Sequence, residues 1–326
     1  MLSCSADEGR RTTAPPLHRS TSTLAHRAFL YDSPDEFVAA MAPFARAGLE
    51  REDAVFAATR EPNVAALREE LGPDAGLVQL EDTTEWKTRP YERLQAFKRM
   101  VAELAPGQAL SAMGEPVWAG SPAVIRQWAR YESIINLALA DAPMRFVCLY
   151  DSATLPDDIL HYAVQTHPER VGGDGGAIAN EHYVAPGDFV PGAAAVRTDD
   201  ALEVALDLPA LRRLLADYGR DLGEPEERVD DLVLAASEVA TNALRHAGAA
   251  ASAVAVWSDD DEIVCQVRDG GDWTSDPLAG WVPPDVGSIS GWGLPIARQL
   301  CDAVEIAHAG GGTTVSLHFG RSRPSS

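Results

Sequence analysis

The sequence predicts two domains: an N-terminal α/β domain with a parallel sheet and a C-terminal α+β domain of two layers. The chain has 326 residues, about twice the length of an average domain. In the N-terminal part, short apolar segments alternate with amphipathic ones, a pattern typical of strands joined by helices. In the C-terminal part, most predicted helices precede strands that pair as hairpins, which favours two layers.

Local signals define the elements of the N-terminal part. The first helix opens at Ser33, which suits the N-cap, with Pro34 in the first turn and Glu36 placed to complete a capping box. Helical spacing or short unbroken apolar runs define the others. We expect strands at 54–59, 76–80 and 146–150, and helices at 63–71, 90–104 and 122–139.

A segment rich in Gly and Pro separates the domains. Its glycines at 172–176 follow no strand and lack the order of a phosphate-binding loop, so we interpret the segment as a linker. Beyond it we expect strands at 202–206, 253–257, 263–268, 303–307 and 314–319, and helices at 209–221, 225–247 and from about 294. The expected organisation is a flexible tail (1–23), a first domain (24–170), a linker (171–195), a second domain (196–320) and a tail (321–326).

Composition excludes several classes of function. The 49 acidic residues outnumber the 27 Lys and Arg residues, and the net charge of −22 disfavours binding to nucleic acid or to anionic lipid. No run reaches the roughly 20 apolar residues of a membrane span. The first 23 residues lack the apolar core of a secretory signal. We therefore expect a cytoplasmic protein that binds neither nucleic acid nor membrane.

The cysteines give no sign of a metal site. Cys4, Cys148, Cys265 and Cys301 lie far apart, and no C-x-x-C motif is present. Zinc and thioredoxin-like chemistry therefore have no support from spacing. Three of the four cysteines lie in apolar runs, where we expect buried free thiols.

Three polar side chains recur at one-turn spacing on the helix predicted at 225–247. Glu238, Asn242 and His246 share a stripe opposite the apolar face that would pack on a sheet. Taken alone, this stripe is explained more simply as a solvated helix face. The motifs that follow it favour a binding site.

Short glycine-containing motifs come next in the chain. Asp269 ends a predicted strand, where its carboxylate can accept the amino hydrogen of a base, and Gly271 gives a flat ring room to approach the backbone. Gly291 and Gly293 precede a predicted helix, whose start offers free N–H groups to an anion. Thr313 begins a strand that can return a hydroxyl to the same place. Each motif is weak alone, but their order is a strong signal.

These motifs resemble the ATP-binding fold of the GHKL superfamily, which includes gyrase, Hsp90, histidine kinases and MutL. E-V-A-T-N-A-L-R-H-A resembles the N box, R-D-G-G the G1 box, G-W-G-L-P-I-A-R the G2 box and G-T-T-V the G3 position. The resemblance implies a two-layer Bergerat fold that binds ATP and Mg²⁺. The implied roles are Glu238 as general base, Asn242 as Mg²⁺ ligand, Arg245 near the phosphates, Asp269 and Gly271 at adenine, Gly291, Gly293 and Leu294 in the lid and phosphate loop, Thr313 beside adenine, and His246 either at phosphate or only capping the stripe.

The lack of a suitably placed histidine argues against one branch of this superfamily, the histidine kinases. A histidine kinase needs a phosphoacceptor His on a helix before the ATP-binding fold, but no His occurs between 183 and 245, and His182 falls in the linker. The compact domain resembles instead the anti-sigma-factor serine/threonine kinases of the RsbW/SpoIIAB kind. The bulky Trp273, Trp281 and Trp292 depart from the expected lid. We expect them to pack on a partner or on the other domain, or to shield ATP.

The N-terminal part resembles a MEDS domain, the DcmR-type sensory domain of methanogens and methylotrophs. The motifs that carry it are H-R-A-F-L-Y-D-S-P-D-E-F, G-E-P-V-W-A-G, W-A-R-Y-E-S-I-I-N, C-L-Y-D and T-H-P, between about residues 24 and 170. The resemblance implies a RecA- or KaiC-like fold that senses a small molecule. Aromatic side chains at helical spacing, such as Tyr131, more often belong to the core than to a ligand site. The candidate pocket residues are His26, Tyr31, Glu115, Trp118, Arg130, Tyr131, Glu132 and Asp151.

Together the two halves resemble RsbA-type regulatory proteins. The resemblance implies a sensory domain that controls an ATP-dependent kinase, with an anti-anti-sigma (STAS) protein as substrate, a sigma factor as a further partner, and an unknown small-molecule or protein signal. Two alternatives stay open: a non-catalytic module that sequesters a partner, and an atypical histidine kinase. The sequence does not decide whether the chain forms a homodimer.

Overall fold

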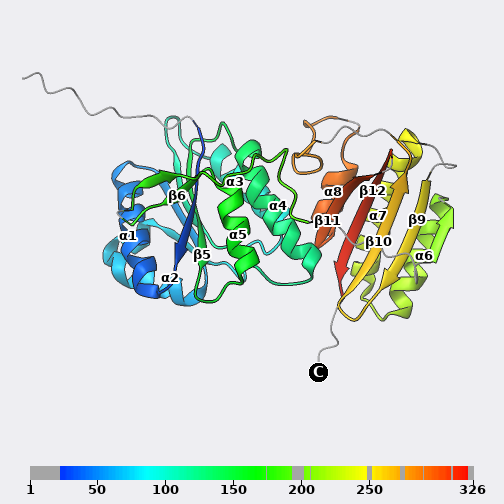
Figure 1. Ribbon diagram of the computed structural model, residues 1–326, viewed down its shortest axis with the longest axis horizontal. Helices are drawn as coiled ribbons and strands as arrows, with labels where there is room; N and C mark the ends of the chain where they lie inside the picture. Colours follow the sequence, from blue (N-terminus) through cyan, green and yellow to red (C-terminus); the bar gives the residue numbers. More distant parts are fainter. Residues whose placement is uncertain are drawn as a thin grey trace, which may run out of the picture.

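The computed structural model describes residues 23–173, 175–192, 202–205, 207–247, 252–271, 276–288, 290–309 and 311–321. Two domains lie side by side along the long axis of the molecule, each built on its own sheet (Figure 1). The N-terminal domain is α/β and the C-terminal domain has an antiparallel sheet, as the sequence predicts.

The N-terminal domain has a seven-stranded sheet in the order β3-β2-β4-β5-β1-β6-β7. Neighbouring strands run parallel, except that β7 is antiparallel to β6. The strands are β1 (Ala25–Tyr31), β2 (Ala54–Thr59), β3 (Gln79–Asp82), β4 (Leu110–Gly114), β5 (Met144–Asp151), β6 (Glu169–Val171) and β7 (Ala177–Ala179). The predicted parallel sheet is confirmed, and a closer likeness to RecA or KaiC stays a prediction.

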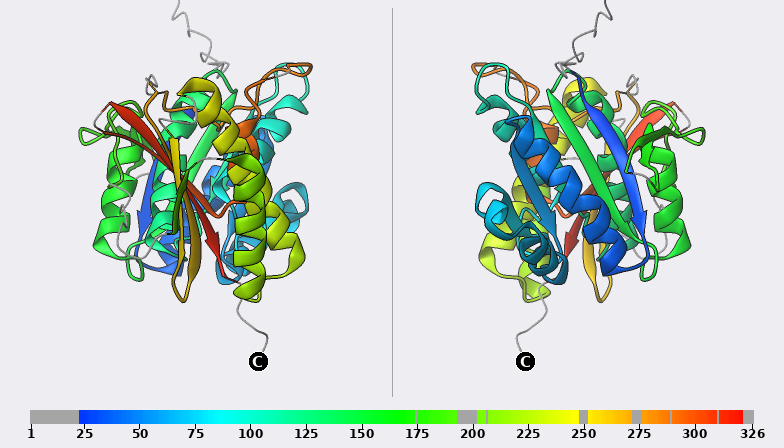
Figure 2. Two further views of the ribbon diagram at one scale, coloured as in Figure 1. Left: turned by 90° about the vertical axis from the view of Figure 1, so that its right-hand side faces the viewer. Right: turned by 90° about the vertical axis from the view of Figure 1, so that its left-hand side faces the viewer.

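Helices cover both faces of this sheet (Figure 2, right). They are α1 (Pro34–Glu50), α2 (Glu61–Leu71), α3 (Pro90–Ala102), α4 (Pro122–Ala138) and α5 (Asp157–Thr166). Phe37 of α1 and Leu67 of α2 are buried on one face of the sheet, in one apolar cluster. Leu94, Tyr131 and Ile159, from α3, α4 and α5, belong to the cluster on the other face. Burial on both faces explains why the central strands β2, β4 and β5 are mostly apolar without alternation.

The start of α1 follows the predicted capping. The Ser33 hydroxyl accepts a hydrogen bond from the Glu36 backbone N–H at 3.4 Å. The Glu36 carboxylate accepts one from the backbone N–H of Asp32 at 2.9 Å. The first bond satisfies a backbone donor that the first helical turn leaves unpaired, and the second holds the residue before the N-cap.

Two predicted stretches of the N-terminal part are different in the structure. A 3-10 helix, η1 (Gly72–Leu77), takes the first two residues of the strand expected at 76–80, and β3 begins only at Gln79. Leu77 lies at the surface, 68% exposed, and does not join the sheet. The expected linker at 171–195 contains β7, which extends the sheet, and Phe189, which is buried. Backbone pairing and one buried ring, which the glycine content does not reveal, bind this segment to the first domain.

The C-terminal domain has a five-stranded antiparallel sheet in the order β11-β12-β10-β9-β8. The strands are β8 (Leu202–Ala205), β9 (Ser252–Ser258), β10 (Glu262–Asp269), β11 (Ala303–Ala309) and β12 (Gly312–Gly320), and the helices are α6 (Leu208–Asp221), α7 (Glu226–His246) and α8 (Gly293–Leu300). The three helices share one apolar cluster with β9, β10, β11 and β12, so they cover one face of the sheet. The predicted two-layer arrangement is confirmed.

Cys148, Cys265 and Cys301 are buried free thiols, as expected, and Cys4 lies outside the described residues. None of the helices in the described part of the chain has both the length and the apolar character needed to cross a bilayer.

The domains contact each other through α4 and β11 and through α3 and α8 (Figure 1). The guanidinium of Arg126 in α4 donates to both carboxylate oxygens of Glu305 in β11, at 2.5 and 3.1 Å. Arg89, just before α3, donates to the backbone oxygen of Gln299 at 2.8 Å. A bidentate, partly buried ion pair such as Arg126–Glu305 fixes the relative orientation of the two elements and also adds stability.

A buried histidine in β12 makes stability depend on pH. The His318 nitrogens lie 3.3 Å from Glu262 and 3.2 Å from Glu305. Burial alone would lower the pKa of His318, but the two carboxylates raise it to about 9. Because this pKa exceeds the unfolded value, the contribution is complete below about pH 6.5 and is lost as the pH rises through 9.

We therefore expect the free energy of unfolding to fall by about 1–3 kcal/mol between pH 6.5 and pH 9. The His318→Gln variant should lose most of this slope in urea titrations, whereas His161→Gln, at an exposed position of α5, should keep it. Equal slopes in the two variants would show that His318 is not the titrating group.

Candidate functional site

Helix α7 holds the first two candidate residues at the border of its buried face. Val229, Leu232 and Ala236 turn toward the sheet and are at most 2% exposed. Glu238 and Asn242 are half-buried one turn apart. The helix begins after Pro225 with two glutamates, which suits the positive end of its dipole. The stripe predicted from the sequence therefore lies beside the core.

The start of α8 meets this part of α7. A Cβ added to Gly293 would lie 2.6 Å from Asn242 Nδ2 and 3.5 Å from the backbone oxygen of Glu238, so a larger residue there would displace the Asn242 side chain. Gly291 has φ +91°, a conformation that favours glycine. Leu294 is 9% exposed and packs in the core that α7 shares. The two helices thus bring Glu238, Asn242 and the glycine motif together.

Asp269 lies at the end of β10, with Gly271 and Thr313 close to it. Its Oδ1 accepts a hydrogen bond from the Gly271 N–H at 2.8 Å, and Asp269 is paired with Thr313 in the sheet. Thr313 is 2% exposed. A Cβ on Gly312 would lie 2.5 Å from the Asp269 backbone oxygen, which explains why the strand begins with glycine.

The end of α7 reaches this second group. A Cβ on Gly271 would be 3.8 Å from the His246 backbone carbon. His246 and Arg245 are both exposed. The structure therefore places the candidates along one edge of the domain, in two adjoining groups on either side of the last turns of α7. Residues 248–251 and 272–275 lie outside the described residues.

The donor set fits Mg-ATP in two respects. Among the described residues, no hydrogen bond engages the amide of Asn242, so its oxygen is available to a hard cation such as Mg²⁺. The N-cap Trp292 makes no side-chain cap hydrogen bond, so backbone N–H groups at the start of α8 can donate to a phosphate.

The loop between Asp269 and Gly291 is attached to the other domain. Trp281 is fully buried in the core of the N-terminal domain, with its ring centroid 6.4 Å from that of Tyr131. Gln95 of α3 donates to the Trp281 backbone oxygen at 2.9 Å. Of the expectations for the bulky loop, packing on the other domain is confirmed for Trp281. Trp292 is 37% exposed, and Trp273 lies outside the described residues.

An arginine of α8 completes the attachment. The Arg298 guanidinium lies 4.4 Å from the Trp281 ring centroid and donates to the backbone oxygens of Ala279 and Val304. It also donates to Gln127 of α4 at 3.3 Å. Burial, together with the nearby Arg130, lowers the pKa of Arg298 to about 9. Sequence patterns gave neither residue a role, although Arg298 ends the motif that resembles the G2 box. Gln127 lies just outside the W-A-R-Y-E-S-I-I-N motif.

The candidate sensory residues lie in separate places. Tyr31, Glu115 and Asp151 gather around Arg60, whose side chain contacts all three at 3.1, 2.6 and 2.8 Å. Trp118 stacks on Tyr162.

Arg130 lines a cleft of about 380 Å³ between the domains, together with Arg126, Arg298 and His308. Tyr131 packs in the core near Trp281. His26 and Glu132 meet elsewhere, with Cys148 and His167. Within the described part of the chain, the eight candidates therefore do not form a single pocket.

Comparison with known families defines the class of each domain. Residues 25–168 match the MEDS family, the MEthanogen/methylotroph, DcmR Sensory domain. Residues 202–319 match the Histidine kinase-like ATPase domain. The chain thus combines a MEDS sensory domain with a histidine kinase-like ATPase domain, and it is a signalling regulator.

The chain is also similar to solved structures. The crystal structure of the RsbU and RsbW domains of Rv1364c from Mycobacterium tuberculosis is similar at 26% identity, over 39% of this chain and 34% of that chain, with a TM-score of 0.30. The match thus spans about a third of that chain's length. No match was found among curated proteins.

Proposed function

We propose that this chain is an ATP-dependent protein serine/threonine kinase of the anti-sigma-factor kind, controlled by its sensory domain. The observation that carries the proposal is the meeting of Glu238 and Asn242 of α7 with the glycine start of α8, beside Asp269 and Thr313. The proposed substrate is a Ser or Thr of an anti-anti-sigma (STAS) protein, and the same domain binds a sigma factor.

Each residue has a role that its position allows. Asn242 would hold Mg²⁺ through its amide oxygen, and Asp269 would accept the amino hydrogen of adenine through the oxygen that does not bond Gly271. Bound Mg-ATP supplies the phosphoryl group. Glu238 would accept the proton of the attacking hydroxyl. Positioning and charge neutralisation account for most of the catalysis in phosphoryl transfer. Arg245, at the exposed end of α7, would add positive charge near the phosphates.

The acceptor class follows from the chain before α7. A histidine kinase needs an acceptor histidine on a helix there, and the sequence has none between 183 and 245. Transfer to a hydroxyl on a second protein is therefore favoured over transfer to a histidine of this chain.

Control by the sensory domain follows from the attachment at Trp281. The loop that would cover ATP is held in the core of the sensory domain, next to Tyr131 of α4. Gly280 in this loop has φ +73°, and a Cβ there would lie 2.7 Å from the Leu294 side chain. A shift of α4 in response to a signal would therefore move the loop and the start of α8 together.

The test is phosphate transfer from radiolabelled ATP to candidate STAS proteins, with and without Mg²⁺. We expect an acid-stable phosphoprotein that forms only with Mg²⁺. Tight ATP-dependent complex formation without transfer would instead support a sequestering module. An acid-labile product would support an atypical histidine kinase, and either result would overturn the proposal.

A further inference from the structure

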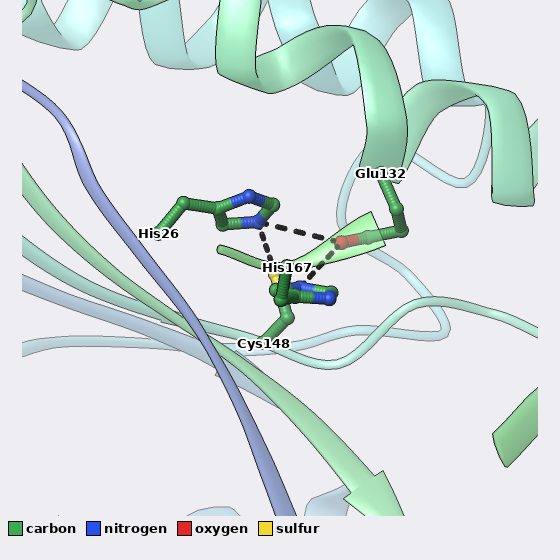
Figure 3. Close-up of side chains that lie close together, drawn as sticks. All are labelled: His26, Glu132, Cys148 and His167. Atoms are coloured by element: carbon green, nitrogen blue, oxygen red, sulfur yellow. Dashed lines mark hydrogen bonds and ion pairs between the residues drawn. The ribbon is translucent and has the colours of Figure 1, made fainter. Parts of the chain in front are cut away.

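Four side chains with metal-binding atoms meet inside the sensory domain (Figure 3). His26 comes from β1, Glu132 from α4, Cys148 from β5, and His167 from the residue after α5. Their exposed fractions are 2%, 1%, 0% and 0%. The strands and helices of the fold therefore place a His₂CysGlu set in a sealed interior.

Three of the six spacings among the four atoms are close to those around a tetrahedral ion. His26 Nε2 lies 3.3 Å from Cys148 Sγ and 3.6 Å from Glu132 Oε2. His167 Nε2 lies 3.2 Å from the same Glu132 oxygen. All four ligand atoms lie within 4.8 Å of one another. With bonds of about 2.1 Å, the ligand atoms around a tetrahedral Zn²⁺ are separated by about 3.4 Å.

Neighbouring groups determine which ring nitrogens face the centre as acceptors. The Asn136 side-chain nitrogen donates to the backbone oxygens of Ser133 and Thr166, so its amide oxygen faces His26 Nδ1, 3.0 Å away. That oxygen can only accept, so we assign the His26 proton to Nδ1. The backbone oxygen of Ala163 lies 2.8 Å from His167 Nδ1. Because this oxygen also can only accept, we assign the His167 proton to Nδ1. Both Nε2 atoms then carry lone pairs toward Glu132.

This arrangement leaves too few protons to form hydrogen bonds among the four side chains. With each ring protonated only at Nδ1, two Nε2 atoms and a carboxylate face one another, and the Cys148 thiol is the one donor in the set. Among the described residues, neither oxygen of Glu132 nor Nε2 of His167 has a hydrogen-bond partner of suitable geometry. Buried acceptors without donors are costly, whereas a cation among them satisfies all four.

We propose that His26, Glu132, Cys148 and His167 bind one Zn²⁺ ion. Imidazole and thiolate ligands suit zinc and disfavour Mg²⁺ and Ca²⁺, which prefer oxygen ligands. The Nδ1 hydrogen bonds to Asn136 and Ala163 are the outer-shell contacts typical of zinc-bound histidines. On binding, the Cys148 S–H bond breaks, its proton passes to solvent, and the sulfur forms the metal bond. Four protein ligands in a sealed interior indicate a permanently held ion.

The site has a direct route to the ATPase domain. Glu132 lies on α4 one turn from Trp128 and beside Tyr131, which belong to the cluster that buries Trp281. Gln127, on the preceding turn, bonds Arg298 of α8. A metal bound to Glu132 would therefore hold the helix that contacts the loop covering the proposed ATP site. This consequence rests on the proposed function, but metal binding itself does not.

The test measures metal in the untagged full-length chain. Protein from zinc-supplemented medium, exchanged into metal-free buffer, should contain about one zinc per chain by mass spectrometry. Protein from cobalt-supplemented medium should show the intense visible bands of tetrahedral Co²⁺ and a thiolate charge-transfer band. Absence of bound zinc, or of the thiolate band, would overturn the proposal.

Matched variants separate this site from incidental binding. Cys148→Ser should abolish the thiolate band, and the nearly isosteric Glu132→Gln should lower zinc affinity at least about tenfold while the chain still folds. Cys265→Ser removes another buried thiol, in β10, and should keep both zinc and the band. Equal zinc affinity in Glu132→Gln and Cys265→Ser would show that the metal binds elsewhere. Phosphotransfer assays play no part in this test, so its outcome is independent of the proposed kinase.

Discussion

Asn242→Ala is expected to abolish detectable binding of Mg-ATP. The alanine removes the amide oxygen proposed to hold Mg²⁺ and opens space next to Gly293, whose backbone approaches Asn242 so closely that a Cβ would lie 2.6 Å from Nδ2. Without the ion, the triphosphate loses its main charge neutralisation. Isothermal calorimetry should show a loss of affinity of at least about 100-fold, with unchanged thermal stability of the nucleotide-free protein.

Glu238→Gln should have a different effect. It keeps the size of the side chain, so nucleotide affinity should change by less than about threefold, while phosphate transfer falls by about 10²–10⁴-fold because a base is lost. The control is Glu227→Gln, an exposed position of the same helix, which should leave both measurements unchanged. If Glu238→Gln kept full transfer activity, Glu238 would not be the base.

Trp281→Ala is expected to cause the largest loss of stability. The ring is fully buried and lies between Tyr131 and the Arg298 guanidinium, so its removal leaves a cavity and an uncovered buried charge. Replacing a buried aromatic residue with alanine costs about 3–5 kcal/mol. Because the ring joins the two domains, thermal unfolding should separate into two transitions in calorimetry.

Trp292→Ala provides the matched control in the same loop. The Trp292 side chain is 37% exposed and donates to the Ser288 backbone oxygen of its own loop, so the change should cost less than about 1 kcal/mol. Single-transition unfolding in both variants would contradict the attachment of the loop to the sensory domain.

Helical periodicity and the order of the strands were enough to predict that the proposed ATP-site residues lie near one another. Glu238 and Asn242 share a stripe because both are on one helix at a spacing of four residues. Asp269 and Thr313 were expected together because each borders a strand of a hairpin-rich sheet, and the structure pairs them. Strand and helix bounds in the C-terminal domain agree with the expectation to within two residues for most elements.

The positions of the candidate residues in the sensory domain were harder to predict from the sequence. The eight candidate pocket residues were chosen by motif and chemical type, and they occupy separate places, because motif membership does not determine where a side chain points. Of the His₂CysGlu set, His26 and Glu132 were candidates and Cys148 and His167 were not. The usual zinc signal is close spacing of ligands along the chain, and His26 and Cys148 are 122 positions apart.

The sequence alone determined the two fold classes, the capping of α1, and the order of the nucleotide-binding motifs, since these depend on contacts within a few turns or one hairpin. Only the tertiary structure decided that Trp281 enters the sensory domain, 186 positions from its partner Gln95, and that four distant side chains converge on one buried centre. The physical reason is that such contacts arise from packing of whole layers, which local periodicity does not encode.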